Sequence, residues 1–273
     1  MAANVAKAMG ALARHRESSI KGYNAAYKIG INSAGSAFEL YVKDLLTGSM
    51  YDNEQERQES YSREFSWLGN QNFPPDAIAK GGDAFEVKKH EKPASSIALN
   101  SSQPRDRLSV HDSKLTSGSL EAFGGREELD LFYIVGTVPG STVKSIYFVQ
   151  GTCYAARNEI YESILSRLSG AIRDSGLDFS NTRELGRVNR ADPLGRASLR
   201  VRGMWQITDP SKAFSNIAPP RPGKEFTAYA IMEARKLDSM GGVPDGVASQ
   251  EVELPDPNNP AKSMDAIVME VSW

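Results

Sequence analysis

The sequence is poor in the residues that build covalent cross-links and transition-metal sites. Its 273 residues include one cysteine, Cys153, so no disulfide can form within the chain. The three histidines, His15, His90 and His111, lie far apart in sequence and make no Cys/His zinc pattern. A disulfide-stabilised scaffold and a zinc-finger fold are therefore excluded, and this cysteine usage is typical of a reducing, cytoplasmic environment.

Long apolar runs are also missing. The longest, 131–138, is far too short to cross a bilayer, and Lys7 interrupts what would have to be the apolar part of a signal peptide. We therefore expect a soluble cytoplasmic protein with no membrane partner. A P-loop, a GxSxG elbow and a Cys/His dyad are absent, which leaves nucleotide enzymes and serine or cysteine hydrolases without support.

Helical and strand patterns alternate along the chain and predict an α/β (α+β) domain, with a mixed central sheet flanked by helices. Apolar residues at helical spacing predict helices at 3–15, 33–48 and 155–170, and the polar, acidic stretch 50–64 reads as a solvated helix or loop. Two hairpins are expected, one pairing 76–79 with 83–90 and the other pairing 131–138 with 143–150.

The C-terminal third is more irregular. We expect a strand at 197–207, a proline-rich connector at 218–222, a mixed segment at 226–237 and a final strand at 266–273. The whole chain, 1–273, is interpreted as a single domain, with a catalytic core at about 33–170 and a DNA-recognition and C-terminal region at about 180–273.

One short motif carries chemistry. Glu-x-Lys occurs once, as Glu86-Val87-Lys88, and of three Pro-Asp pairs only the one ending at Asp76 lies upstream of it, with nine residues between Asp76 and Glu86. Side chains on a strand alternate between faces, so Glu86 and Lys88 share one side while Phe85 and Val87 point to the core. The glycine turn folds the preceding strand back, which should bring Asp76 beside them.

Two carboxylates and an ammonium suit phosphodiester hydrolysis. The carboxylates can hold Mg²⁺ at about 2.0–2.1 Å, and the ion polarises the phosphate and lowers the pKa of a bound water. Lys88 either orients that water or deprotonates it. We expect Asp76, Glu86 and the main chain of Val87 as metal ligands. Glu39, on the helix upstream, either joins them or is an ordinary surface residue.

Longer strings carry a resemblance. NFPPDAIAKGGDAFEVKK, IALNSSQPRDRL and TRELGRVNRADPLGRASLRVRGMW resemble the NgoPII family of type II restriction endonucleases, over most of the chain from Glu39 to about Phe214. The resemblance implies a PD-(D/E)xK fold with Asp76, Glu86 and Lys88 as catalytic residues. It also implies Mg²⁺ dependence, a homodimer, cleavage of both strands of duplex DNA at a short GC-rich palindrome, and a separate methyltransferase of the same specificity. It does not extend beyond Pro222.

Charge is segregated although the net charge is only −2. Residues 182–203 hold six arginines and two acids, whereas residues 224–273 hold nine acids and four bases. Such a basic segment is typical of a DNA-binding surface, where arginine reads guanine or holds phosphate. The sixth arginine of this segment is Arg183. We expect DNA contacts from Arg187, Asn189, Arg190, Arg196, Arg200 and Arg202, and from a polar turn near the Glu86–Lys88 strand through Asn100, Ser101, Ser102, Arg105 and Arg107.

Two alternatives remain. One is a structure-specific or repair nuclease on the same core, such as a junction resolvase. The other is a DNA-binding protein without chemistry, in which the acidic pair is structural.

Overall fold

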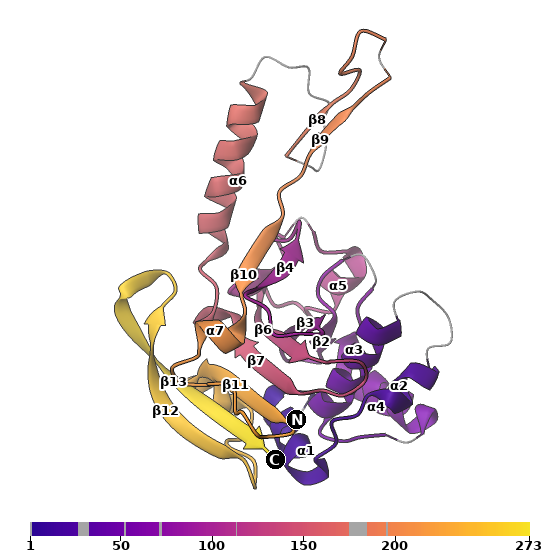
Figure 1. The fold of residues 1–273 in the computed structure, drawn as a ribbon, viewed down its shortest axis with the longest axis vertical. Coiled ribbons are helices and arrows are strands. Elements are labelled where there is room, and N and C mark those ends of the chain that lie inside the picture. The colour runs from indigo at the N-terminus through magenta and orange to yellow at the C-terminus, as the bar shows by residue number, and fades with distance from the viewer. Residues whose placement is uncertain are drawn as a thin grey trace.

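The computed structural model describes residues 2–26, 33–51, 53–70, 73–112, 114–174, 185–194 and 196–273. A mixed sheet forms the centre of the body, with helices packed on it, and a long helix and a hairpin rise from one end (Figure 1). Within these ranges no helix combines the length and the apolar character needed to cross a membrane.

Nine described strands make up the central sheet. Eight follow the order β1-β2-β3-β6-β7-β11-β13-β12, and β5 pairs with β6 off this path. The β3–β6 and β7–β11 pairs are parallel and the others are antiparallel, so the predicted mixed sheet is confirmed. The strands are β1 (Phe65–Trp67), β2 (Ala77–Ala79), β3 (Ala84–His90), β5 (Arg107–Ser109), β6 (Glu128–Thr137), β7 (Ser145–Gln150), β11 (Thr227–Glu233), β12 (Ala248–Asp256) and β13 (Asn259–Ser272).

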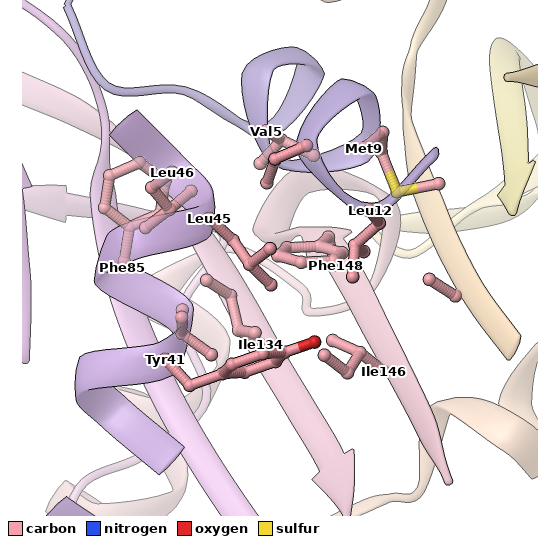
Figure 2. Close-up of a cluster of buried hydrophobic side chains, with 14 of the residues drawn as sticks. Val5, Met9, Leu12, Tyr41, Leu45, Leu46, Phe85, Ile134, Ile146 and Phe148 are labelled. Atoms are coloured by element: carbon pink, nitrogen blue, oxygen red, sulfur yellow. The ribbon is translucent and has the colours of Figure 1, made fainter. Parts of the chain in front are cut away.

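Helices α1 (Val5–His15) and α3 (Ser33–Thr47) cover one face of the sheet. Figure 2 shows Met9 and Leu12 of α1 and Leu45 of α3 among side chains of β6 and β7. These side chains are at most 1% exposed. Each methylene buried in this way contributes about 0.8 kcal/mol, so this burial stabilises the packing of α1 and α3 on the sheet.

The same face is buttressed by a buried polar cluster. Asp44 of α3, fully buried, accepts hydrogen bonds from Tyr23 (2.8 Å) and Tyr61 (2.6 Å) and pairs with Arg57 (3.1 Å). These partners belong to α2 (Lys21–Ala26) and α4 (Glu54–Glu64). Burial raises the pKa of Asp44, against the hydrogen bonds and the charge of Arg57. The cluster ties three helices together through one carboxylate.

The opposite face packs smaller elements. The two-stranded sheet of β4 (Ser96–Asn100) and β10 (Trp205–Thr208) and helix α5 (Ser117–Glu121) lie over β3 and β6. Helices α7 (Pro210–Ala213) and α8 (Ala234–Ser239) and the short 3-10 turn η1 (Gly151–Cys153) complete the body.

An arm rises from this body. It consists of helix α6 (Asn158–Arg173) and the hairpin of β8 (Gly186–Val188) and β9 (Leu199–Val201) (Figure 1). The strand predicted at 197–207 is interrupted: β9 pairs with β8 in the arm, whereas β10 pairs with β4 in the body. Both predicted hairpins form, as β2–β3 and β6–β7.

The C-terminal segment joins the central sheet. Strand β11 pairs directly with β7, and β13 and β12 extend the same sheet. Helix α1 also packs into the hydrophobic core. The physical core therefore reaches both ends of the chain.

Candidate active site

Strand β3 places Glu86 and Lys88 on the face away from α1 and α3. Phe85 and Val87 point into the core, 0% and 7% exposed, as their alternation with Glu86 and Lys88 predicts. Glu86 and Lys88 are partly buried on the other face, and Lys88 Nζ lies 2.5 Å from Glu86 Oε1. Both retain solvent-accessible side-chain area, 17% for Glu86 and 27% for Lys88, so a substrate can reach them.

Asp76 is the residue just before β2, and it is hydrogen-bonded to β3. Its backbone N–H donates to the Phe85 carbonyl at 3.0 Å, and its Oδ2 accepts a hydrogen bond from the Val87 N–H at 2.6 Å. Because β2 begins at Ala77, the Asp76 carboxylate takes the place of a strand partner at the edge of β3. The structure therefore brings the carboxylate of Asp76 beside the Glu86–Lys88 segment.

The last residue of β1 and the segment after it hold the backbone around Asp76 in place. Trp67 Nε1 donates to the Pro75 carbonyl at 2.9 Å. Gly69 has φ +82, and a Cβ there would lie 2.5 Å from the Asp76 carbonyl oxygen, so only glycine permits this approach. Two contacts thus position Asp76, the residue that precedes the β2–β3 hairpin.

The electrostatics of the site favour a bound cation. Burial, followed by the charge of Glu86, raises the pKa of Asp76 to about 7, against the opposing charge of Lys88. Burial lowers the pKa of Lys88, but Glu86 and Asp76 outweigh it and raise the pKa above its usual value. Lys88 is therefore an ammonium, and a cation bound beside Asp76 would favour the ionised form of this carboxyl, which burial and Glu86 disfavour.

Helix α3 adds two groups. Glu39 raises the pKa of Asp76, so its charge acts at the site, and its side chain is 38% exposed. Lys43 lies one turn further along α3, and its side chain is 8% exposed. Its Nζ lies 4.0 Å from Glu39 Oε2 and donates a hydrogen bond to the Leu68 carbonyl at 3.0 Å. Burial lowers the pKa of Lys43, while Glu39 and Asp76 oppose that shift. Lys43 was not predicted, because a Glu-Lys pair four residues apart on a helix reads as a surface ion pair.

The donor set fits a hard divalent cation. Magnesium prefers oxygen ligands and keeps several waters, so one or two carboxylates suffice. Asp76 and Glu86 supply them, and the raised pKa of Asp76 shows that positive charge would stabilise its ionised form. Across the described residues, no three Asp, Glu, His or Cys side chains are grouped to hold a metal. A place for Glu39 among the metal ligands stays a prediction.

The predicted DNA-binding arginines gather on the arm. Arg187 of β8 lies directly opposite Arg200 of β9, so both side chains leave the hairpin on the same face. Asn189, Arg190 and Arg196 are exposed near its tip. Arg202, also exposed, follows β9, and Arg183 lies outside the described residues.

The polar turn adjoins the base of this arm. Asn100, at the end of β4, pairs with Trp205 of β10, the strand that continues from the hairpin. Asn100 and Ser101 are exposed and Ser102 is partly buried. Residues that are a hundred positions apart in sequence therefore form one stretch of surface.

Two predicted contacts are engaged elsewhere. Arg105 is 5% exposed, and its Nη2 lies 2.5 Å from Asp112 Oδ2. Arg107 is half-buried and pairs with Asp130 at 3.0 Å. The guanidinium of Arg105 is thus part of the protein interior, which a string of polar residues in the sequence could not reveal.

Comparison with known proteins identifies the family of this chain. The family described as NgoPII restriction endonuclease matches residues 3–248. The prediction that the resemblance begins near Glu39 and ends before Pro222 is therefore wrong, because the match begins before α1 and continues past β11. The chain is 42% identical over 244 residues to the type II restriction enzyme NgoPII of Neisseria gonorrhoeae, covering 86% of this chain and 87% of the relative. No solved structure matches it. By both measures, the chain belongs to the NgoPII restriction endonuclease family.

Proposed function

We propose that this protein is a type II site-specific deoxyribonuclease that cuts both strands of duplex DNA at a short, GC-rich palindrome in the presence of Mg²⁺. The observation that carries the proposal is the bond from the Val87 N–H to Asp76, which sets one acid beside the strand that bears Glu86 and Lys88. Membership of the family supports the same reading.

Each residue of the site has a role in this reaction. Asp76, Glu86 and the main-chain carbonyl of Val87 would hold Mg²⁺, which would polarise the phosphate and lower the pKa of a bound water. Lys88, an ammonium because its pKa is raised, donates to the attacked phosphate and offsets its growing negative charge. Glu39 acts through its charge rather than as a third carboxylate ligand, given the absence of such a trio among the described side chains.

DNA is gripped by the arm and its base. Arg187, Arg190, Arg196, Arg200 and Arg202 supply the positive charge, and Asn189 contacts a base edge. Asn100, Ser101 and Ser102 contact the backbone near the cut phosphate. Arg105 is left out of this interface because Asp112 already binds it, and Arg107 is secondary because Asp130 and Glu128 lie beside it.

The chain forms a single domain, and two copies of it form the active homodimer. Strands β11, β13 and β12 share a sheet with β3, which supports a single domain over 1–273. A palindrome is read by a protein of matching twofold symmetry, so the active form is a homodimer. A separate methyltransferase of the same specificity protects the sites of the host.

Digestion of unmethylated DNA tests the proposal. With Mg²⁺, circular and linear duplexes should give discrete fragments whose mapped ends share one palindrome, and Asp76→Asn should give none. Cutting confined to four-way junctions would support the alternative repair nuclease. Binding without cutting by the wild-type protein, with Mg²⁺ present, would support the alternative of a DNA-binding protein without chemistry.

A further inference from the structure

The end of the β8–β9 hairpin carries an exposed leucine. The described residues 189–194 and 196–198 connect β8 to β9, and we call them the tip. Leu194 of the tip is 74% exposed, more than any other large apolar side chain in the part of the chain that the structure describes. The hairpin projects away from the central sheet (Figure 1). Single exposed apolar side chains are common on protein surfaces, so the surroundings of Leu194 decide what it does.

The backbone that carries Leu194 is held by one carboxylate. Asp192 accepts hydrogen bonds from the N–H groups of Leu194 at 2.9 Å, Arg196 at 3.2 Å and Ala197 at 2.5 Å. The ring of Pro193 fixes the backbone angle φ directly before Leu194. Because the turn is already ordered by these constraints, Leu194 loses little conformational entropy when it binds a ligand.

The charge around Leu194 is positive. Arg190 and Arg196 are exposed at the tip, and two more arginines lie opposite each other on β8 and β9. Asp192 is the only acid among the described residues 185–194 and 196–202, and its carboxylate accepts the backbone N–H groups of the turn. An apolar side chain among arginines matches duplex DNA, which is a polyanion outside and a stack of apolar base faces inside.

We propose that Leu194 is a wedge that inserts between two stacked base pairs of the bound duplex, while Arg190 and Arg196 bind phosphates beside the opened step. An apolar wedge partly unstacks a base step and bends the duplex. The cost depends on the step, and pyrimidine–purine steps open most readily. Leu194 would therefore add specificity at a position where no base edge is contacted. This inference deepens the proposed function and rests on it, because it needs the arm to bind duplex DNA.

A protein partner fits the tip less well. A twofold-related copy that met Leu194 with its own tip would bring like-charged arginines together, which is unfavourable. One leucine side chain also covers far less area than the roughly 1,200 Å² that a stable protein interface buries. An opened base step, in contrast, has space for a single side chain.

Fluorescence of a cytosine analogue tests the wedge. Pyrrolocytosine, which stacking quenches, replaces each cytosine in and beside the palindrome mapped by digestion. The full-length Lys88→Ala protein with Mg²⁺ is used, so that the duplex is bound and not cut. On binding, fluorescence at one step should rise about threefold as the bases unstack. Adding Leu194→Ala should remove most of this rise, whereas Leu194→Met, which is long and apolar, should keep it.

Leu199→Ala is the matched control. It removes the same atoms from another exposed leucine of the hairpin, 51% exposed on β9, and should keep the rise in fluorescence. Circular dichroism checks that each variant folds. Equal losses in Leu194→Ala and Leu199→Ala would overturn the wedge, because they would show that the hairpin as a whole is needed.

Affinity gives an independent measurement. Leu194→Ala should weaken binding to the mapped palindrome about tenfold, because less apolar surface is buried. Binding to an unrelated duplex, and the dependence of binding on salt, should not change, because phosphate contacts determine both.

The remaining outcomes separate the wedge from the proposed function. A protein that cuts at its palindrome but raises fluorescence at no position, or an unchanged rise in Leu194→Ala, would overturn the wedge alone. Altered sedimentation of Leu194→Ala with unchanged fluorescence would assign the tip to a protein partner and overturn the wedge as well. A wild-type protein that neither binds nor cuts duplex DNA would overturn the proposed function and the wedge together.

Discussion

The active-site edge, a name we use for Asp76, Glu86 and Lys88, differs from the arm in how much of it is buried. Glu86 and Lys88 lie on β3, whose residues Phe85 and Val87 are packed into the main core, and Asp76, just before β2, is bonded to the same strand. The positions of all three are therefore determined by tertiary packing. Helix α6 has no buried residue, and most residues of the β8–β9 hairpin are exposed. Substitution at the edge therefore disturbs geometry, while substitution on the arm leaves the body folded and changes what the surface binds.

The two regions also differ in their charges. The edge mixes acids and ammonium groups at close range, where each alters the pKa of its neighbours. The hairpin is rich in arginine. Its acid, Asp192, accepts hydrogen bonds from the backbone N–H groups of Leu194, Arg196 and Ala197. Acids and ammonium groups that offset one another at short range are typical of a site that reacts with one phosphate. A surface with many arginines is typical of a protein that binds a long polyanion such as DNA.

The largest effect is expected at the edge. Lys88→Ala should reduce the cleavage rate about 1000-fold or more, because the phosphate loses the ammonium that offsets its charge. Duplex affinity should change little. Asp76→Ala should abolish cutting as well. Lys89→Ala is the control, since Lys89 pairs with Glu91 outside the site. Normal cutting by Lys88→Ala, measured in single-turnover assays, would remove the role assigned to this lysine.

The arm should give the next largest effect. If Arg200 reads a guanine, Arg200→Ala should cost about 1–3 kcal/mol on cognate DNA and relax specificity at one position. If it holds a phosphate, binding should fall alike on all sequences and depend less steeply on salt. Affinities for cognate and single-mismatch duplexes separate the two, and Arg187→Ala, directly opposite, provides the comparison. Uniform losses for every arginine of the arm would remove its recognition role.

The difference between the regions also explains what the sequence could predict. Period-two alternation and the glycine turn predict the β2–β3 hairpin, because the signal lies within fifteen residues and one face is buried. The pairing of β4 with β10 joins segments a hundred residues apart, and no local pattern announces it. The break between β9 and β10 follows from this pairing as well.

The site residues show the same difference between local patterns, which a sequence reveals, and long-range contacts, which it does not. Asp76, Glu86 and Lys88 form a local motif, and the structure places them together. Lys43 and the burial of Arg105 depend on what packs against them, Leu68 in one case and Asp112 in the other. A sequence gives the type of these side chains but not their neighbours.

Lys43 should give a moderate effect that separates positioning from catalysis. Lys43→Met keeps the volume but removes a positive charge near Asp76, so the pKa of Asp76 should rise and the acid limb of the pH–rate profile should move to higher pH. We expect about a tenfold lower rate at pH 7, partly recovered at higher pH. Lys7→Met removes a paired lysine outside the site and should leave the profile unchanged. An unshifted profile in Lys43→Met would show that Lys43 is only structural.

The smallest expected effect is on stability without metal. The raised pKa of Asp76 means that the folded protein binds a proton more tightly than the unfolded chain, so this group stabilises the fold at low pH. That contribution is lost as the pH rises from about 4 through about 7. In EDTA at pH 8, Asp76→Asn should therefore melt a few degrees above wild type, at about 2–4 °C per kcal/mol. Adding Mg²⁺ should raise the melting temperature of wild type but not of Asp76→Asn, because binding to the folded state alone stabilises it. Equal shifts in both proteins, measured by scanning calorimetry, would place the cation away from Asp76.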